Sequence, residues 1–140
     1  MLGVVFGLLL GYVGYMLVPT VGPRYFLEDR FSVTLEGDLF HAAVVSPLIE
    51  MHGGALPRDC FPSLHTATST TVLGFVLRYR PWLAIVFGPV VLLLLAATIY
   101  LRYHYVVDLA AGALLGGLML WAAPRVDGWW AAATGRPEVA

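Results

Sequence analysis

The stretch WLAIVFGPVVLLLLAATIY, residues 82–100, contains no charged side chain. A helix of about 20 predominantly apolar residues is long enough to cross the hydrocarbon core of a bilayer. Three other segments of roughly that length cover residues 3–18, 62–77 and 105–122. The pattern therefore predicts an all-α fold. We expect an integral membrane helix bundle of about four transmembrane helices, formed by residues 1–140 as a single membrane domain.

The overall composition points the same way. Hydrophobic residues make up 59% of the chain, charged residues make up 12%, and the mean hydropathy is +0.80. Soluble proteins average about 45–50% apolar and about 25% charged residues, so this composition favours a membrane protein. A net charge of −1 gives no electrostatic basis for a nucleic-acid partner. Cys60 is the one cysteine, which excludes a disulfide within the chain.

The segments between and beside the predicted spans are less apolar. Residues 19–61 form a long polar connection, within which residues 40–51 carry apolar side chains at helical spacing. We expect these to form a short helix lying at the membrane interface. The chain opens inside its first predicted span, which is compatible with a missing upstream part. The tail from Pro124 onward is expected to be loose.

Two of the predicted spans carry glycines at the spacing of one helical turn. Small residues at this spacing allow a second helix to approach closely. They predict a packing partner for each span, from the same chain or from a second copy in a homo-oligomer. The residues concerned are Gly3, Gly7 and Gly11 in the first span, and Gly112 and Gly116 in the last.

Counting four crossings places residues 63–65 and 102–104 on the same membrane face. Arginines on the opposite face favour that face as cytoplasmic under the positive-inside rule, although Arg30 and Arg58 on the first face argue against it. We therefore expect the shared face to be extracytoplasmic. All eight basic residues are arginine, a bias typical of GC-rich genomes, and we expect the membrane to be the bacterial inner membrane.

Two ionisable residues at the start of the last span are candidates for chemistry. His104 and Asp108 are four residues apart and therefore share one helical face. A carboxylate bonded to one imidazole nitrogen fixes the tautomer and leaves the other nitrogen free to attack. The alternative is a structural polar pair between helices. Because burying ionisable groups in a membrane is costly, we favour a catalytic role.

The start of the second span carries a possible anion site. Pro62 suits the first turn of a helix, and Ser63 with the free N–H groups of that turn could hold a phosphate. His65 could protonate a leaving oxygen, while Arg102 and Arg24 could add positive charge. Each has a simpler alternative: a capping serine, an interfacial histidine, a snorkelling arginine and a loop arginine.

The strings Phe61-Pro62-Ser63-Leu64-His65 and His104-Tyr105-x-x-Asp108 resemble the second and third signature motifs of the type 2 phosphatidic acid phosphatase (PAP2) superfamily. In detail they look most like the branch containing inositol phosphorylceramide synthase-like proteins. The resemblance covers about residues 18–118. Two departures stand out, because the first family motif begins with Lys and this chain has none, and the usual third-motif Arg position holds Thr98.

The resemblance implies a metal-independent phosphoryl transfer without a cofactor. His104 would form a phosphohistidine, Asp108 would orient it, and His65 would act as the proton carrier. Ser63 would hold the phosphate oxygens together with the arginines, and no metal is expected. A substrate from the bilayer would be a lipid phosphate.

Four functions remain open at the level of sequence. The first is hydrolysis of a lipid phosphate, and the second is transfer of a phospho-head group to a lipid alcohol. The third is a non-enzymatic membrane protein in which His65 and His104 bind haem or a metal. The fourth is a degenerate family member kept as a scaffold.

Overall fold

The computed structural model describes residues 2–32 and 58–135, and in these ranges it contains helices and no strand. Four long helices carry the fold: α1 (Leu2–Leu17), α4 (Leu64–Tyr79), α5 (Ala84–Tyr100) and α6 (Val106–Thr134). Three short ones connect them: α2 (Pro23–Phe26), η1 (Glu28–Arg30) and η3 (Pro81–Leu83). The all-α prediction is confirmed. The expected interfacial helix at residues 40–51 lies outside the described residues.

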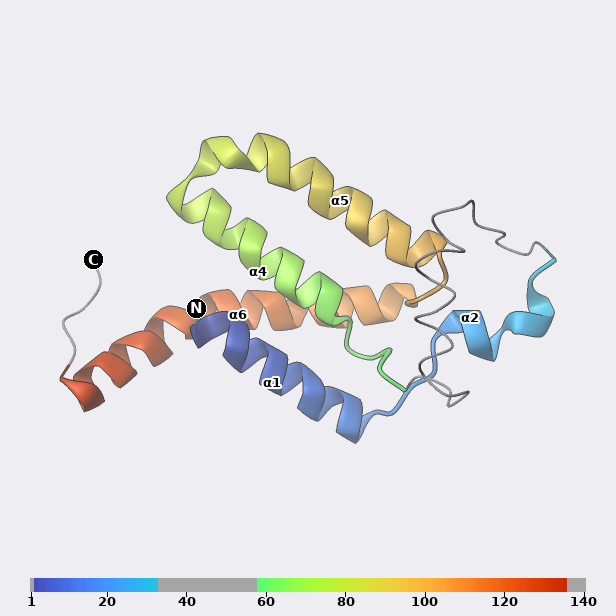
Figure 1. Cartoon of the computed structure of the whole chain (residues 1–140), viewed down its shortest axis with the longest axis horizontal. Coiled ribbons are helices and arrows are strands. Elements are labelled where there is room, and N and C mark those ends of the chain that lie inside the picture. The colour runs from blue at the N-terminus through green and yellow to red at the C-terminus, as the bar shows by residue number, and fades with distance from the viewer. Residues whose placement is uncertain (1, 33–57, 136–140) are drawn as a thin grey trace, which may run out of the picture.

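Helix α6 is the centre of the bundle. It packs against both α4 and α1, and α4 packs in turn against α5, with which it forms an antiparallel hairpin. Figure 1 shows the N-terminal ends of α4 and α6 at the same end of the bundle as the C-terminal ends of α1 and α5. The two histidine-bearing strings therefore lie together, as the counting of crossings predicts.

Glycines bring α4 and α6 into close contact. A β-carbon at Gly112 would collide with the backbone oxygen of Ser63, and one at Gly116 would lie 2.7 Å from the backbone oxygen of Ala67. Small residues at this spacing allow helix backbones to approach each other. Gly7 and Gly11 of α1 similarly lie against Met119 and Leu64 of this chain. An interface with a second copy through these glycines stays a prediction.

In the part of the chain that the structure describes, two helices have the length and apolar character to cross a bilayer. They cover Pro81–Tyr100 and Val106–Thr134, while Val5–Leu17 is a shorter apolar helix. Helix α4 has 16 residues and a hydroxyl-rich first half, so its length and composition are weaker evidence for a membrane span. The helix lengths therefore do not confirm the predicted count of four spans.

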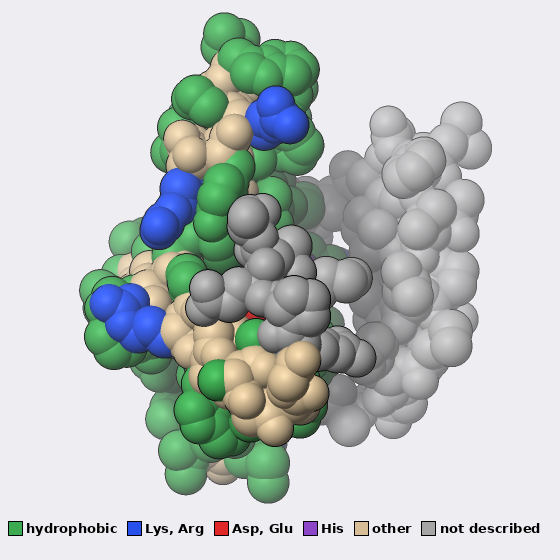
Figure 2. Space-filling view, turned by 90° about the vertical axis from the view of Figure 1, so that its left-hand side faces the viewer, with side chains coloured by type: hydrophobic (Ala, Val, Ile, Leu, Met, Phe, Trp, Pro, Cys, Tyr) green, Lys and Arg blue, Asp and Glu red, His purple; other side chains and the backbone are tan. Residues whose placement is uncertain are grey.

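The surface of the bundle is strongly apolar. Ile85, Leu93 and Leu114 are each more than 70% exposed, whereas soluble monomers rarely expose large contiguous apolar patches. Figure 2 looks at the end of the molecule away from the histidine strings, where arginine side chains stand among hydrophobic ones. The elements at this end carry Arg78 in the last turn of α4, Arg80 directly after α4, and Arg125 in α6.

The expectation of a loose tail from Pro124 onward was wrong for residues 124–134, and residues 136–140 lie outside the described residues. Helix α6 continues through this proline to Thr134 and ends where Gly135 adopts a left-handed conformation with φ of 65°. A proline inside a helix removes one backbone hydrogen bond and can kink the helix without ending it. The alanine-rich residues that follow favour helix, and Gly135 supplies the usual C-terminal cap.

Candidate active site

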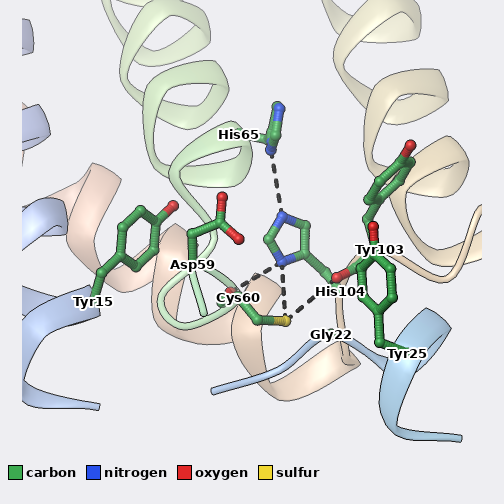
Figure 3. A pocket seen from close by; sticks show the side chains of 8 residues that line it. All are labelled: Tyr15, Gly22, Tyr25, Asp59, Cys60, His65, Tyr103 and His104. Carbon is green, nitrogen blue, oxygen red and sulfur yellow. Dashed lines mark hydrogen bonds between the residues drawn. The ribbon is translucent and has the colours of Figure 1, made fainter. Parts of the chain in front are cut away.

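A cavity of about 80 Å³ opens where the two histidine strings meet. This volume is large enough for several water-sized groups, since one water needs about 10–15 Å³ by the same kind of measure. Its walls come from the end of α1, the segment before α4, the α2 region and the α5–α6 connection. Figure 3 labels the lining residues, which are Tyr15, Gly22, Tyr25, Asp59, Cys60, His65, Tyr103 and His104.

Backbone hydrogen bonds hold these segments in place. Ser63 N–H donates to the Asp108 carbonyl at 3.1 Å, which ties the start of α4 to the first turn of α6. Arg24 N–H donates to the Arg102 carbonyl at 2.9 Å, and Cys60 N–H donates to the Thr20 carbonyl at 3.3 Å. Residues far apart in sequence are thereby fixed around one cavity.

The two predicted histidines face each other. His65 Nδ1 lies 3.3 Å from His104 Nε2, and the ring centroids are 5.6 Å apart. His104 Nδ1 lies 3.0 Å from the Cys60 carbonyl oxygen. A carbonyl only accepts hydrogen bonds, so Nδ1 must carry the proton and neutral His104 has its free lone pair on Nε2. That lone pair accepts from His65 Nδ1–H, a contact drawn as a dashed line in Figure 3.

The charge state of His104 follows from its surroundings. The side chain is only 6% exposed. Burial, together with the nearby His65, holds the pKa of His104 below its ordinary value, while the Asp108 carboxylate opposes this effect. His104 is therefore neutral near pH 7, the state in which Nε2 can act as a nucleophile.

Asp108 lies beside His104 but does not bond to it as the sequence predicts. Its Oδ2 is 3.8 Å from His104 Nδ1, which is too long for a hydrogen bond. Oδ2 instead accepts from Tyr105 N–H at 2.7 Å and from the Cys60 thiol at 2.9 Å. As the third residue of α6, Asp108 turns back to cap the helix start. Its influence on His104 is therefore electrostatic, and the Cys60 carbonyl fixes the tautomer.

Cys60 is a site residue that sequence reasoning missed. It is 3% exposed, and its Sγ lies 2.9 Å from Asp108 Oδ2 and 3.6 Å from His104 Nδ1. Burial and the hydrogen bond to the Asp108 carboxylate raise the pKa of Cys60 to about 12, so the thiol keeps its proton. The available signal was its position two residues before Pro62, at the edge of the motif.

Ser63 occupies the N-cap of α4. Its hydroxyl oxygen accepts from Thr66 N–H at 3.3 Å and from the Thr66 hydroxyl at 3.1 Å, and the residue is fully buried. It does not line the cavity. The structure thus gives Ser63 the capping role that the sequence left open as the alternative.

The two predicted arginines lie outside the cavity lining. Arg102 has φ of 60°, and its guanidinium lies 3.7 Å from the centroid of the Phe31 ring. Arg24 Nη1 donates to the Tyr103 hydroxyl at 3.3 Å, so it stands at the rim. Thr98 stands at the position of the family arginine, and its backbone carbonyl oxygen accepts hydrogen bonds from the N–H groups of Tyr103 and His104. Of the predicted phosphate-binding set, Arg24 forms a hydrogen bond to a lining side chain, that of Tyr103.

The comparison with known families agrees with the motifs at this site. A family model described as the PAP2 superfamily matches residues 1–122. The chain belongs to the PAP2 superfamily. The PAP2 match covers every residue that lines the cavity, and it includes both histidine strings.

A curated protein is also similar to this chain. The PA-phosphatase related-family protein of Dictyostelium discoideum is 33% identical over 99 residues. The matched segment covers 69% of this chain and 18% of that relative, so the chain corresponds to a small part of it. No solved structure matches the chain.

Proposed function

We propose that the chain is a membrane-embedded lipid-phosphate phosphatase that forms a phosphohistidine on His104 and needs no metal. The observation that carries this proposal is the paired geometry of the two histidines. His104 Nδ1–H is held by the Cys60 carbonyl at 3.0 Å, and the unprotonated Nε2 lies 3.3 Å from His65 Nδ1. One ring thus supplies a nucleophile and the other a proton.

In the first step, His104 Nε2 attacks phosphorus and the bond from phosphorus to the lipid oxygen breaks. His65 gives its proton to the departing alkoxide, a contribution of about 10²–10⁴-fold for a positioned acid. His104 gains positive charge as the P–N bond forms. The Cys60 carbonyl and the Asp108 carboxylate, 3.0 Å and 3.8 Å from Nδ1, stabilise this charge.

In the second step, His65 takes a proton from water, and the resulting hydroxide attacks phosphorus. The P–N bond breaks, phosphate leaves, and the lone pair returns to His104 Nε2.

Arg24 at the rim, bonded to the Tyr103 hydroxyl, offers positive charge to the phosphate group of an incoming substrate. Arg102 would have to leave the face of Phe31 to contribute.

A lipid substrate is supported by the surface around the site. The helices that end at the cavity expose large aliphatic side chains along their length, such as Leu93 of α5 and Leu114 of α6. We place these surfaces in the acyl-chain region of a bilayer, as expected for a bacterial inner-membrane protein, with the cavity at its extracytoplasmic face. A phosphate on a lipid would then reach His104 without leaving the membrane surface.

Transfer to an alcohol is the second candidate, and two lining residues favour it. Asp59 and Tyr15 line the cavity beside His104 and offer oxygen atoms that can bond to a hydroxyl group. An acceptor alcohol held there could replace water in the second step. Such a reaction would match the inositol phosphorylceramide synthase-like branch.

Haem ligation by the two histidines fits the geometry less well. Axial ligands on opposite sides of an iron, with bonds of about 2.0 Å each, would stand about 4 Å apart, whereas His65 Nδ1 and His104 Nε2 are 3.3 Å apart. The rings would have to separate to admit a haem iron.

The test is phosphate release by the purified chain in detergent with excess EDTA, using a panel of lipid phosphates. We expect EDTA-resistant release that His104→Ala abolishes and that Trp129→Ala, an exposed position at the other end of α6, leaves intact. Addition of a lipid alcohol separates the two candidates, because a transferase would form a new phospholipid in place of free phosphate. Absence of both products would contradict the proposal and favour the scaffold interpretation.

A further inference from the structure

Three metal-ligating side chains converge on the inner side of His104. One ligand atom from each of Cys60, His104 and Asp108 lies within 4.8 Å of the other two, and all three residues are buried. Sγ is 3.6 Å from Nδ1 and 2.9 Å from Oδ2, and Nδ1 is 3.8 Å from Oδ2. We infer that these three atoms form an inhibitory binding site for a borderline-soft divalent cation such as Zn²⁺.

The spacing of the three atoms suits a tetrahedral ion. Bonds of about 2.3 Å to sulfur and about 2.0–2.1 Å to nitrogen and oxygen place tetrahedral ligands about 3.3–3.6 Å apart. The Sγ–Nδ1 distance already has this value, the Nδ1–Oδ2 distance is about 0.5 Å longer than its tetrahedral value, and the Sγ–Oδ2 distance is about 0.6–0.7 Å shorter. Cys60 and His104 also line the cavity, which gives an ion a path to the cluster.

The charge balance favours a divalent ion. One thiolate and one carboxylate carry two negative charges, so a bound divalent cation leaves the buried cluster neutral. Thiolate and imidazole are the ligands that Zn²⁺ and Co²⁺ prefer over Mg²⁺ or Ca²⁺.

Binding would act on the nucleophile through the His104 tautomer. The Cys60 thiol releases its proton to solvent as the metal–sulfur bond forms. The Nδ1 lone pair becomes the ligand, so the imidazole proton of His104 moves from Nδ1 to Nε2, and His65 takes the tautomer in which its Nδ1 accepts from His104 Nε2–H. Nε2 then has no lone pair to attack phosphorus, and the proposed reaction stops. This inhibitory effect rests on the proposed function, whereas the existence of the site does not.

The direct test is titration of the purified chain in detergent with Co²⁺, which absorbs when bound to thiolate. We expect a near-ultraviolet thiolate-to-cobalt charge-transfer band that saturates at one ion per chain. His104→Gln and Asp108→Asn should each weaken Co²⁺ affinity by at least about tenfold, the scale seen for perturbed metal sites. Asp59→Asn is the matched control, because this carboxylate lines the cavity outside the cluster.

Two outcomes would overturn the site. One is the absence of the band in the wild-type chain, and the other is a band unchanged by His104→Gln and by Asp108→Asn, which would mean binding by the thiol alone. X-ray absorption at the cobalt edge needs no variant, and it should show one sulfur and an imidazole around the ion. A first shell without sulfur would equally contradict the proposal.

A separate measurement addresses inhibition. Zn²⁺ should stop phosphate release by the wild-type chain, and EDTA should restore it. Cys60→Ser keeps a hydrogen-bond donor for Asp108 but removes the thiolate, so its half-inhibition should require at least about tenfold more Zn²⁺. Equal sensitivity of both proteins would contradict inhibition through this cluster. If no protein releases phosphate while Co²⁺ still binds, the proposed function fails and the site stands.

Discussion

Replacing Asp108 with Asn should slow phosphoryl transfer without removing the helix cap. The amide oxygen of Asn can still accept from Tyr105 N–H, which bonds Asp108 Oδ2 at 2.7 Å, but the negative charge is lost. At 3.8 Å and an effective dielectric constant of about 20, the attraction between this carboxylate and a positive His104 is about 4 kcal/mol. Each 1.4 kcal/mol corresponds to about tenfold in rate. We therefore expect kcat to fall by up to about 10³-fold.

The assay is phosphate release at saturating substrate, with the helix content of each protein measured by circular dichroism. Asp127→Asn is the matched control, because it makes the same change at an exposed position near the other end of α6. Its kcat should stay within about twofold of wild type, as expected for a surface substitution. A loss of less than tenfold for a folded Asp108→Asn protein would refute the electrostatic role of this carboxylate.

Three further predictions concern ionisation, packing and capping. Because burial lowers the pKa of His104, its nucleophilic neutral form persists below pH 6.5, and kcat/KM should fall only at more acidic pH; an acid limb above pH 6.5 in the pH–rate profile would contradict this. Gly112→Ala should destabilise the protein by about 1–3 kcal/mol because its β-carbon meets the Ser63 backbone, whereas Gly117→Ala meets open space; equal thermal inactivation of both in detergent would contradict the packing. Ser63→Ala should cost about 1 kcal/mol of stability through the lost cap and leave KM within about threefold, about 0.7 kcal/mol; a much larger rise in KM would restore its phosphate-binding role.

The pairing of His65 with His104 could be predicted because it depends on helix order alone. Successive membrane-spanning segments alternate in direction. The start of the second predicted span, which carries His65, therefore lies at the same membrane face as the end of the third, after which His104 follows. The structure confirms this with the 3.3 Å contact between the rings. The apolar segments also predict the ends of α1, α4 and α5 within two residues and the start of α6 within one. They do not predict the end of α6, which lies at Thr134, 12 residues beyond the predicted span.

The contacts of Asp108 could not be predicted, because they depend on loop geometry. The i,i+4 spacing suggests a direct bond to His104, yet His104 lies before the helix begins and Asp108 caps its first turn. Cys60 comes from a separate segment and fits between them, bonding the carboxylate with its thiol. Nothing in the spacing of these residues along the chain indicates that approach.

The partners of the arginine side chains could not be predicted from the sequence either. Arg102 adopts a left-handed backbone conformation and stacks on Phe31, a residue 71 positions earlier in the chain. A cation over an aromatic ring can be stabilised by about 0.5–2 kcal/mol. The Phe31 ring therefore competes with a phosphate for the Arg102 guanidinium. Sequence alone identifies the charge but not the partner that holds it.

The central claim is that His104 Nε2 carries the phosphoryl group during turnover. The most direct measurement is rapid quenching of the purified chain during reaction with a lipid phosphate labelled on phosphorus. The account predicts label bound to the protein through an acid-labile, base-stable bond, in the wild-type chain and not in His104→Ala. Phosphate release without such a labelled protein, or label that persists in His104→Ala, would contradict it.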